Sequence, residues 1–119
     1  HGQNLKLFLL RCNMTKITIF KKNEKIWAFQ VKGHTGFAES GNDIVCSAIS
    51  TATQMALVGL KEVLKLDVES DIKDGYMQVK LLQDNAQAQA ILCSMEKTLA
   101  DIAKNYARNV KMEVKRDVY

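Results

Sequence analysis

The chain has 119 residues, is 47% hydrophobic and 25% charged, and contains no proline. These values predict one globular domain with a single modest core. Its apolar runs are short, so we expect no membrane-spanning segment. The formal net charge is +4, but a nucleic-acid-binding domain usually concentrates its basic residues. The nearest such cluster, "RNVKMEVKR" at 108–116, also holds acids and is typical of a solvated edge strand. We therefore expect no nucleic-acid partner.

The three cysteines, Cys12, Cys46 and Cys93, are an odd number without the spacing of a metal or redox motif. This pattern predicts reduced thiols in a cytoplasmic protein, with no metal and no cofactor. Residues 1–13 precede Met14 and "TKITIF", which looks like a natural start. We expect 1–13 to be a tag, upstream sequence or disorder, and 14–119 to form the single domain.

The first predicted elements are two β-rich runs, "KITIF" at 16–20 and "KIWAFQV" at 25–31, which the polar "KKNE" joins as a hairpin. In the second run Trp27 and Phe29 should point to one side. A helix then begins at Asp43 and continues through "DIVCSAISTATQMALVGLKEVLKL". The apolar residues expected on its buried face are Val45, Ile49, Ala52, Ala56, Leu60 and Val63.

The second half of the chain repeats this order of elements. Strands are predicted at 67–72 and 76–82, joined through "KDG", and a helix at about 86–106. "NVKMEVK" alternates Val110, Met112 and Val114 with charged residues, as a strand does. The stripe expected to be buried on the second helix consists of Ile91, Met95, Leu99, Ile102 and Tyr106.

The order ββαββαβ predicts an α/β two-layer sandwich. Strands that alternate apolar and polar residues have one wet face, so both helices should pack on the other face of a mostly antiparallel sheet. This fold alone decides no function.

One segment carries residues suited to chemistry, "VKGHTGFAESGNDIVCSAIS" at 31–50. Asp43 is a good N-cap, which would place Cys46 in the first helical turn, where the helix dipole and unpaired amides favour a thiolate. Cys46 should then lie at the edge of the buried stripe, sheltered but reachable. His34 precedes it in a glycine-rich loop, and twelve residues are enough for the chain to fold back.

A cysteine and a histidine in contact are the minimal equipment for covalent acyl transfer. Gly33, Gly36, Phe37 and Gly41 would make a flexible loop over the site, able to act as a lid. Two alternatives stay open from the residues alone. The cysteine can be a small buried hydrophobe and the histidine an ordinary loop residue. The pair can also belong to a metal site, but this alternative is weaker because two ligands do not make a zinc centre.

The motif "GHTGFAESGNDIVCSAIS" resembles the signature of the ribosomal-processing cysteine protease family, Prp. The shared pattern is Gly-His, a small residue, Gly, an aromatic residue, and then Asp-Ile-Val-Cys-x-Ala-x-Ser. The resemblance implies a cytoplasmic bacterial endopeptidase that acts as a homodimer. It would remove the short N-terminal extension of a large-subunit ribosomal protein, cutting after an aromatic residue in a hydrophobic sequence. By motif position Cys46 would be the nucleophile, His34 the general acid/base, and Asp43 and Ser50 supporting residues.

Two other classes of function compete with this one. A non-catalytic ribosome- or RNA-associated binding protein is suggested only by the basic C-terminal strand, and its binding would weaken steeply with salt. A structural or regulatory protein would simply bury Cys46, and its thiol would then react slowly with alkylating reagents.

Overall fold

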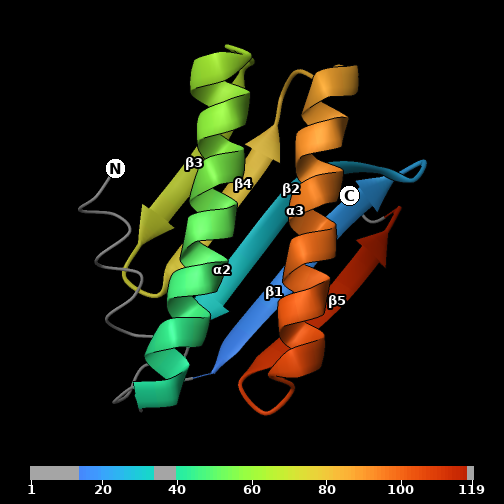
Figure 1. Ribbon diagram of the computed structural model, residues 1–119. Coiled ribbons are helices and arrows are strands. Elements are labelled where there is room, and N and C mark those ends of the chain that lie inside the picture. The colour runs from blue at the N-terminus through green and yellow to red at the C-terminus, as the bar shows by residue number, and fades with distance from the viewer. Residues whose placement is uncertain (1–13, 34–39, 118–119) are drawn as a thin grey trace.

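The computed structural model describes residues 14–33 and 40–117 of the chain. The elements follow the predicted order ββαββαβ (Figure 1). They are β1 (Thr15–Lys22), β2 (Lys25–Gly33), α2 (Ser40–Val58) with a π-helical turn η1 (Gly59–Val63), β3 (Val68–Lys73), β4 (Tyr76–Leu81), α3 (Ala86–Asn105) and β5 (Val110–Arg116).

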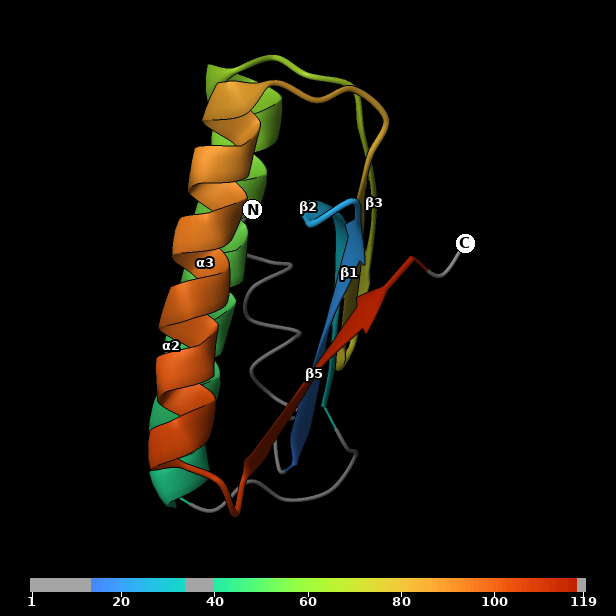
Figure 2. The same cartoon turned by 90° about the vertical axis from the view of Figure 1, so that its right-hand side faces the viewer.

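The five strands form one sheet in the order β3-β4-β2-β1-β5. Strand β1 pairs with β5 in parallel, and the other neighbouring pairs are antiparallel. Helices α2 and α3 lie side by side in a second layer that covers one face of the sheet (Figures 1 and 2). The predicted two-layer sandwich with a mostly antiparallel sheet is therefore confirmed.

The β1–β2 hairpin closes through a two-residue turn. Asn23 and Glu24 have φ values of 53° and 63°, the left-handed geometry that matches the twist of two paired strands. In the β3–β4 hairpin Gly75 has a φ of 70°, which glycine adopts without steric cost. The "KKNE" and "KDG" segments thus form turns as predicted.

A β-bulge in the first hairpin separates two aromatic side chains. Phe20 pairs with Ala28 and Lys21 with Ile26, so Trp27 is the extra residue. Phe29 is fully buried in the core, whereas half-buried Trp27 packs on Phe20 with ring centroids 5.6 Å apart. The expectation that Trp27 and Phe29 share a side is wrong, because a bulge shifts the alternation by one residue.

The core lies between the sheet and the two helices, and its α2 side follows the predicted stripe as far as Leu60. Val63 departs from it and is 70% exposed. The π-helical turn Gly59–Val63 explains the difference, because it adds a residue to the turn and rotates the following side chains off the stripe.

Helix α3 begins where Asn85 accepts a hydrogen bond from the amide of Ala88 at 2.8 Å, a side-chain N-cap. Its buried stripe contains Met95 and Leu99 as predicted, but Tyr106 lies past the end of the helix and is 47% exposed. The remaining buried positions of this helix are Ala88 and Leu92. Gln89 ties the helix to β2, since its side-chain amide exchanges two hydrogen bonds, of 2.9 and 2.8 Å, with the backbone of Ile26.

The segment Ile44–Val63 is long and apolar enough to cross a membrane by length and composition alone. This differs from the expectation drawn from the short apolar runs. In the structure 44% of the most apolar part of this segment is buried. The core helix of a soluble protein can have the same length and composition.

Candidate active site

Cys46 lies near the N-terminal end of α2, the helix that follows the histidine-containing segment. The helix begins at Ser40, so Cys46 is in its second turn, and Asp43 is inside the helix instead of capping it. Gly41 is helical too, and not part of the predicted loop. The influence of the helix dipole falls off within the first turn. A thiolate formed at Cys46 would therefore need another source of stabilisation.

Among the described residues, one such group is the hydroxyl of Thr15, the first residue of β1. The Thr15 Oγ1 and the Cys46 Sγ lie 3.8 Å apart, and the two residues are 1% and 2% exposed. A hydroxyl this close to sulfur donates to it when the sulfur is a thiolate, and such charge-assisted bonds are stronger than neutral ones. Cys46 is more deeply buried than the sequence suggested, because it faces β1 instead of the edge of the stripe.

The same threonine marks where β2 ends. Thr15 is the register partner of Gly33, and the Gly33 amide donates to the carbonyl of Gly75 at 2.8 Å. The Thr15 amide in turn donates to the carbonyl of Asn109 at 2.8 Å. Gly33, predicted as a loop residue, is thus a fixed strand residue. The residue after it is His34, which, with Gly36 and Phe37, lies outside the described residues.

Ser50 lies four residues after Cys46 on α2, hence on the same side of the helix. It is 1% exposed, and within the described structure its hydroxyl has no hydrogen-bond partner. A buried hydroxyl without a partner is uncommon in folded proteins and calls for an explanation. Ser50 thus lies one helical turn from Cys46, and its supporting role stays a prediction; the side chain of Asp43 lies outside the described residues.

Thr15 is the site residue that sequence reasoning missed. It precedes the first predicted strand by one residue and belongs to no motif. The one available signal was the alternation of β1, which places Thr15 on the same face as Ile17 and Ile19 and so toward the helices.

The two described cysteines are in different states. Cys93 is a free, exposed thiol, in keeping with its place off the apolar stripe of α3. The Cys46 sulfur is disulfide-bonded, which differs from the expectation of reduced thiols at this position. A sulfur in a disulfide is no nucleophile, so chemistry at Cys46 requires its reduction first.

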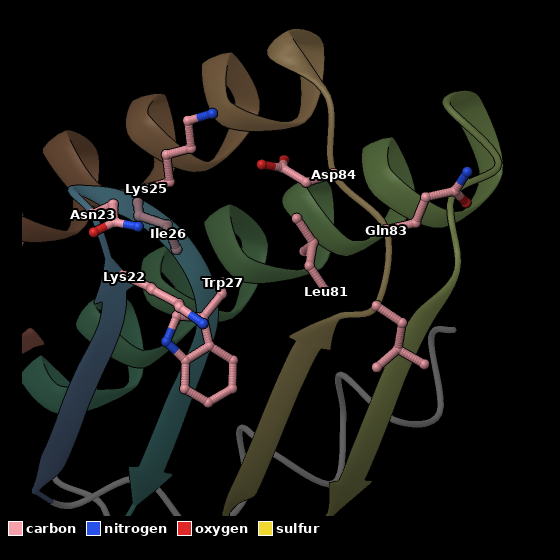
Figure 3. A pocket seen from close by; sticks show the side chains of 9 residues that line it. Lys22, Asn23, Lys25, Ile26, Trp27, Leu81, Gln83 and Asp84 are labelled. Atoms are coloured by element: carbon pink, nitrogen blue, oxygen red, sulfur yellow. The ribbon is translucent and has the colours of Figure 1, made fainter. Parts of the chain in front are cut away.

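A pocket of about 340 Å³ opens at the hairpin end of β1 and β2, the opposite end of β1 from Thr15. Figure 3 shows its lining, which consists of Lys22, Asn23, Lys25, Ile26, Trp27, Leu81, Leu82, Gln83 and Asp84. It holds none of the site residues predicted from the sequence. In the part of the chain that the structure describes, no group of three or more histidine, cysteine or acidic residues could hold a metal ion.

A sulfur held by a hydroxyl, on a helix beside the strand that leads to a histidine, suits nucleophilic acyl chemistry. Comparison with known proteins establishes the class: the chain is a cysteine protease. Residues 14–111 match the family model described as "Cysteine protease Prp", so the chain belongs to the Prp family. A relative from Staphylococcus aureus, "Ribosomal processing cysteine protease Prp", is 31% identical over 87 residues, which are 70% of this chain and 81% of the relative.

Solved structures confirm the fold. A Streptococcus mutans protein superposes with a TM-score of 0.78 at 22% identity, covering 88% of this chain and 97% of its own. The S. aureus Prp in complex with a substrate peptide gives a TM-score of 0.78 at 24% identity, with 86% of this chain and 100% of that one covered. The same S. aureus enzyme with a covalently linked product peptide gives 0.76 at 24% identity, over the same shares of the two chains.

Proposed function

We propose that this protease removes the short N-terminal extension of a bacterial large-subunit ribosomal protein, cutting after an aromatic residue. Cys46 is the proposed nucleophile and His34 the proposed general acid/base. Membership of the Prp family supports this assignment, as does the S. aureus relative described as a ribosomal processing protease. The motif that resembles the Prp signature contains both residues.

The observation that carries the proposal is the position of Thr15, which contacts Cys46 and pairs with the last residue of β2. Its hydroxyl lies 3.8 Å from the Cys46 sulfur, and its register partner is Gly33, the residue before His34. The chain therefore leaves β2 for His34 directly beside the strand residue that contacts the sulfur. A cysteine buried only as a small hydrophobe has no need of this neighbour.

The chemistry follows the two-step scheme of thiol hydrolases. The Cys46 thiolate attacks the scissile carbonyl carbon, and collapse of the tetrahedral intermediate breaks the C–N bond and leaves a thioester. The His34 imidazolium gives its proton to the departing amine. Neutral His34 then takes a proton from water, which attacks the thioester, releases the carboxylate product and returns the thiol.

Asp43 and Ser50 are proposed as supporting residues. Ser50 lies on the same side of α2 as Cys46, and its buried hydroxyl has no hydrogen-bond partner among the described residues. A substrate carbonyl or the reacting sulfur would supply one. We further propose that the protein works in the cytoplasm as a homodimer, as the family resemblance implies. A reducing compartment would keep Cys46 in its reactive form.

The test is cleavage of a peptide that carries the ribosomal extension, measured by mass spectrometry after full reduction of the protein. We expect one cut, after the aromatic residue. Cys46→Ala should lower kcat/KM by a factor of about 1,000 or more, since covalent catalysis loses its nucleophile. His34→Ala should act similarly.

Cys93→Ala is the matched control, because it removes the free, exposed cysteine of α3. It should cleave like the parent protein. Retention of activity in Cys46→Ala, with the same cut site, would refute the assignment.

A further inference from the structure

The sheet has a second face, which the helices do not cover (Figure 2). Lysine side chains from four strands meet there in one cross-strand row. The register pairs Lys73 with Tyr76, Tyr76 with Lys32, Lys32 with Lys16, and Lys16 with Lys111. We call these five residues the lysine row. It crosses all five strands, which are about 4.8 Å apart, so it is about 19 Å long.

The alternation of side chains along each strand shows to which face of the sheet the lysines point. The adjacent row consists of Ile17, Val31, Met77, Ile72 and Met112, all of which belong to the core or pack against it. Neighbouring residues of a strand point to opposite faces. The lysines therefore point away from the helices, and all four are exposed.

The number of lysines in the row equals the charge excess of the chain. The sequence contains 17 basic and 13 acidic residues, so without the four lysines of the row the two signs balance. Like charges directly opposite each other destabilise a sheet, yet Lys16 faces a lysine on either side. A fold that keeps such a row gains stability when an anion covers it.

Acidic neighbours neutralise the row only in part. Glu113 lies 3.5 Å from Lys16, and Asp71 lies 3.8 Å from Lys73, but exposed pairs of this kind contribute little. Within the described residues Lys32 and Lys111 have no ion pair. The Tyr76 ring lies between two lysines, whose ammonium nitrogens are 6.0 Å (Lys32) and 5.1 Å (Lys73) from its centroid.

We propose that the lysine row is a docking site for single-stranded RNA, held through its phosphates. Lysine is a point charge that suits phosphate without demanding one geometry, and a row that runs from one edge strand of the sheet to the other matches a linear polymer. The row is also one residue from the active site along both β1 and β2, since Lys16 follows Thr15 and Lys32 precedes Gly33. The preference for RNA over other polyanions rests on the proposed function, because the proposed substrate is a protein of the ribosome, a particle built largely of RNA.

This proposal revises the expectation that no nucleic acid binds. The sequence shows no basic cluster because the four lysines come from four separate strands. Only the register of the sheet brings them together.

The test is fluorescence anisotropy of a labelled oligouridine of about 12 nucleotides, a length within the range of single-stranded sites. Binding through four phosphates should give a slope of about −3 in log K against log salt, at about −0.7 per contact. The double variant Lys16→Glu/Lys32→Glu should bind about tenfold more weakly or worse, and its slope should be smaller by about 1.5. Lys16→Gln/Lys32→Gln, which adds no acid, should show the same reduced slope.

Lys61→Glu/Lys97→Glu is the matched control, since it makes the same charge change on exposed residues of the helical layer. It should lose no more than about threefold, as expected for a general electrostatic effect. Equal losses in the two glutamate variants would overturn the proposal. So would an absence of RNA binding at low salt, or equal competition by a polyglutamate peptide or by phosphatidylserine vesicles. RNA binding is measured without any cleavage, so its failure is separate from failure of the proposed protease activity.

Discussion

The two faces of the sheet differ in character although the same strands form both: one is buried against the helices and the other is exposed and carries the lysine row. Toward the helices, Thr15 contacts the Cys46 sulfur and Phe29 is fully buried. One residue further along β1, on the other face, Lys16 belongs to an exposed row of like charge. The alternation of a strand therefore places the proposed catalytic chemistry and the charged surface at the same end of the sheet, separated only by its thickness. Substitutions in the lysine row should leave the packing of the core and the Cys46 site unchanged, and substitutions in the core should leave the charge of the row unchanged.

The largest effect is expected from a change in the helix-facing layer. Phe29→Ala removes the largest of the fully buried side chains and should lower the free energy of unfolding by about 3–5 kcal/mol. Urea denaturation would measure it. Lys111→Gln, on the open face, is the control and should change stability by less than about 0.5 kcal/mol. Similar losses in both variants would remove the contrast between the faces.

A smaller effect is expected at the contact between Thr15 and Cys46. Thr15→Val keeps the shape but loses the hydroxyl, so the thiolate should form at higher pH after the protein has been reduced. A hydrogen bond of about 1 kcal/mol corresponds to an alkylation rate about fivefold lower near pH 7. The measurement is iodoacetamide labelling against pH, resolved by mass.

Thr15→Ser should restore the parent pH profile at Cys46, and labelling of Cys93 should be the same in all three proteins. A profile for Thr15→Val that coincides with the parent profile would mean that the 3.8 Å contact has no electrostatic role.

The smallest effect concerns repulsion within the lysine row. Lys111 is the register partner of Lys16, and it has no ion pair among the described residues. Lys111→Gln should raise the free energy of unfolding by about 0.2–0.5 kcal/mol at low salt, because it removes a like-charge pair. The gain should vanish near 1 M salt, where the Debye length is about 3 Å. A loss of stability at low salt would show that the row is already neutralised.

Periodicity carried most of the fold prediction. Val110, Met112 and Val114 alternate toward the core as expected, and α2 buries its predicted stripe as far as Leu60. The departures at Trp27 and Val63 have one cause: a bulge and a π-helical turn each insert one residue, and neither leaves a mark in residue composition.

The candidate site was predicted in part. The motif indicated Cys46 and Ser50, which the structure places four residues apart on one side of α2. Asp43 has the chemistry of an N-cap, yet the helix starts three residues earlier, at Ser40. The alternation of β1 places Thr15 toward the helices but does not show that it contacts Cys46, and the lysine row depends on which residues face each other across strands. Register is a tertiary property that one sequence does not reveal.

The parallel pairing of β1 and β5 has a consequence for synthesis of the protein. Thr15 pairs with Val110, about 95 residues later, so β1 leaves the ribosome long before its partner strand β5 has been made. Until then β1 is an open edge that other chains can pair with. Contacts this distant in sequence slow folding, and completion of the sheet must follow release of the C-terminal strand from the exit tunnel. A newly made copy of this protease therefore lacks a complete sheet until β5 has been translated and has left the tunnel.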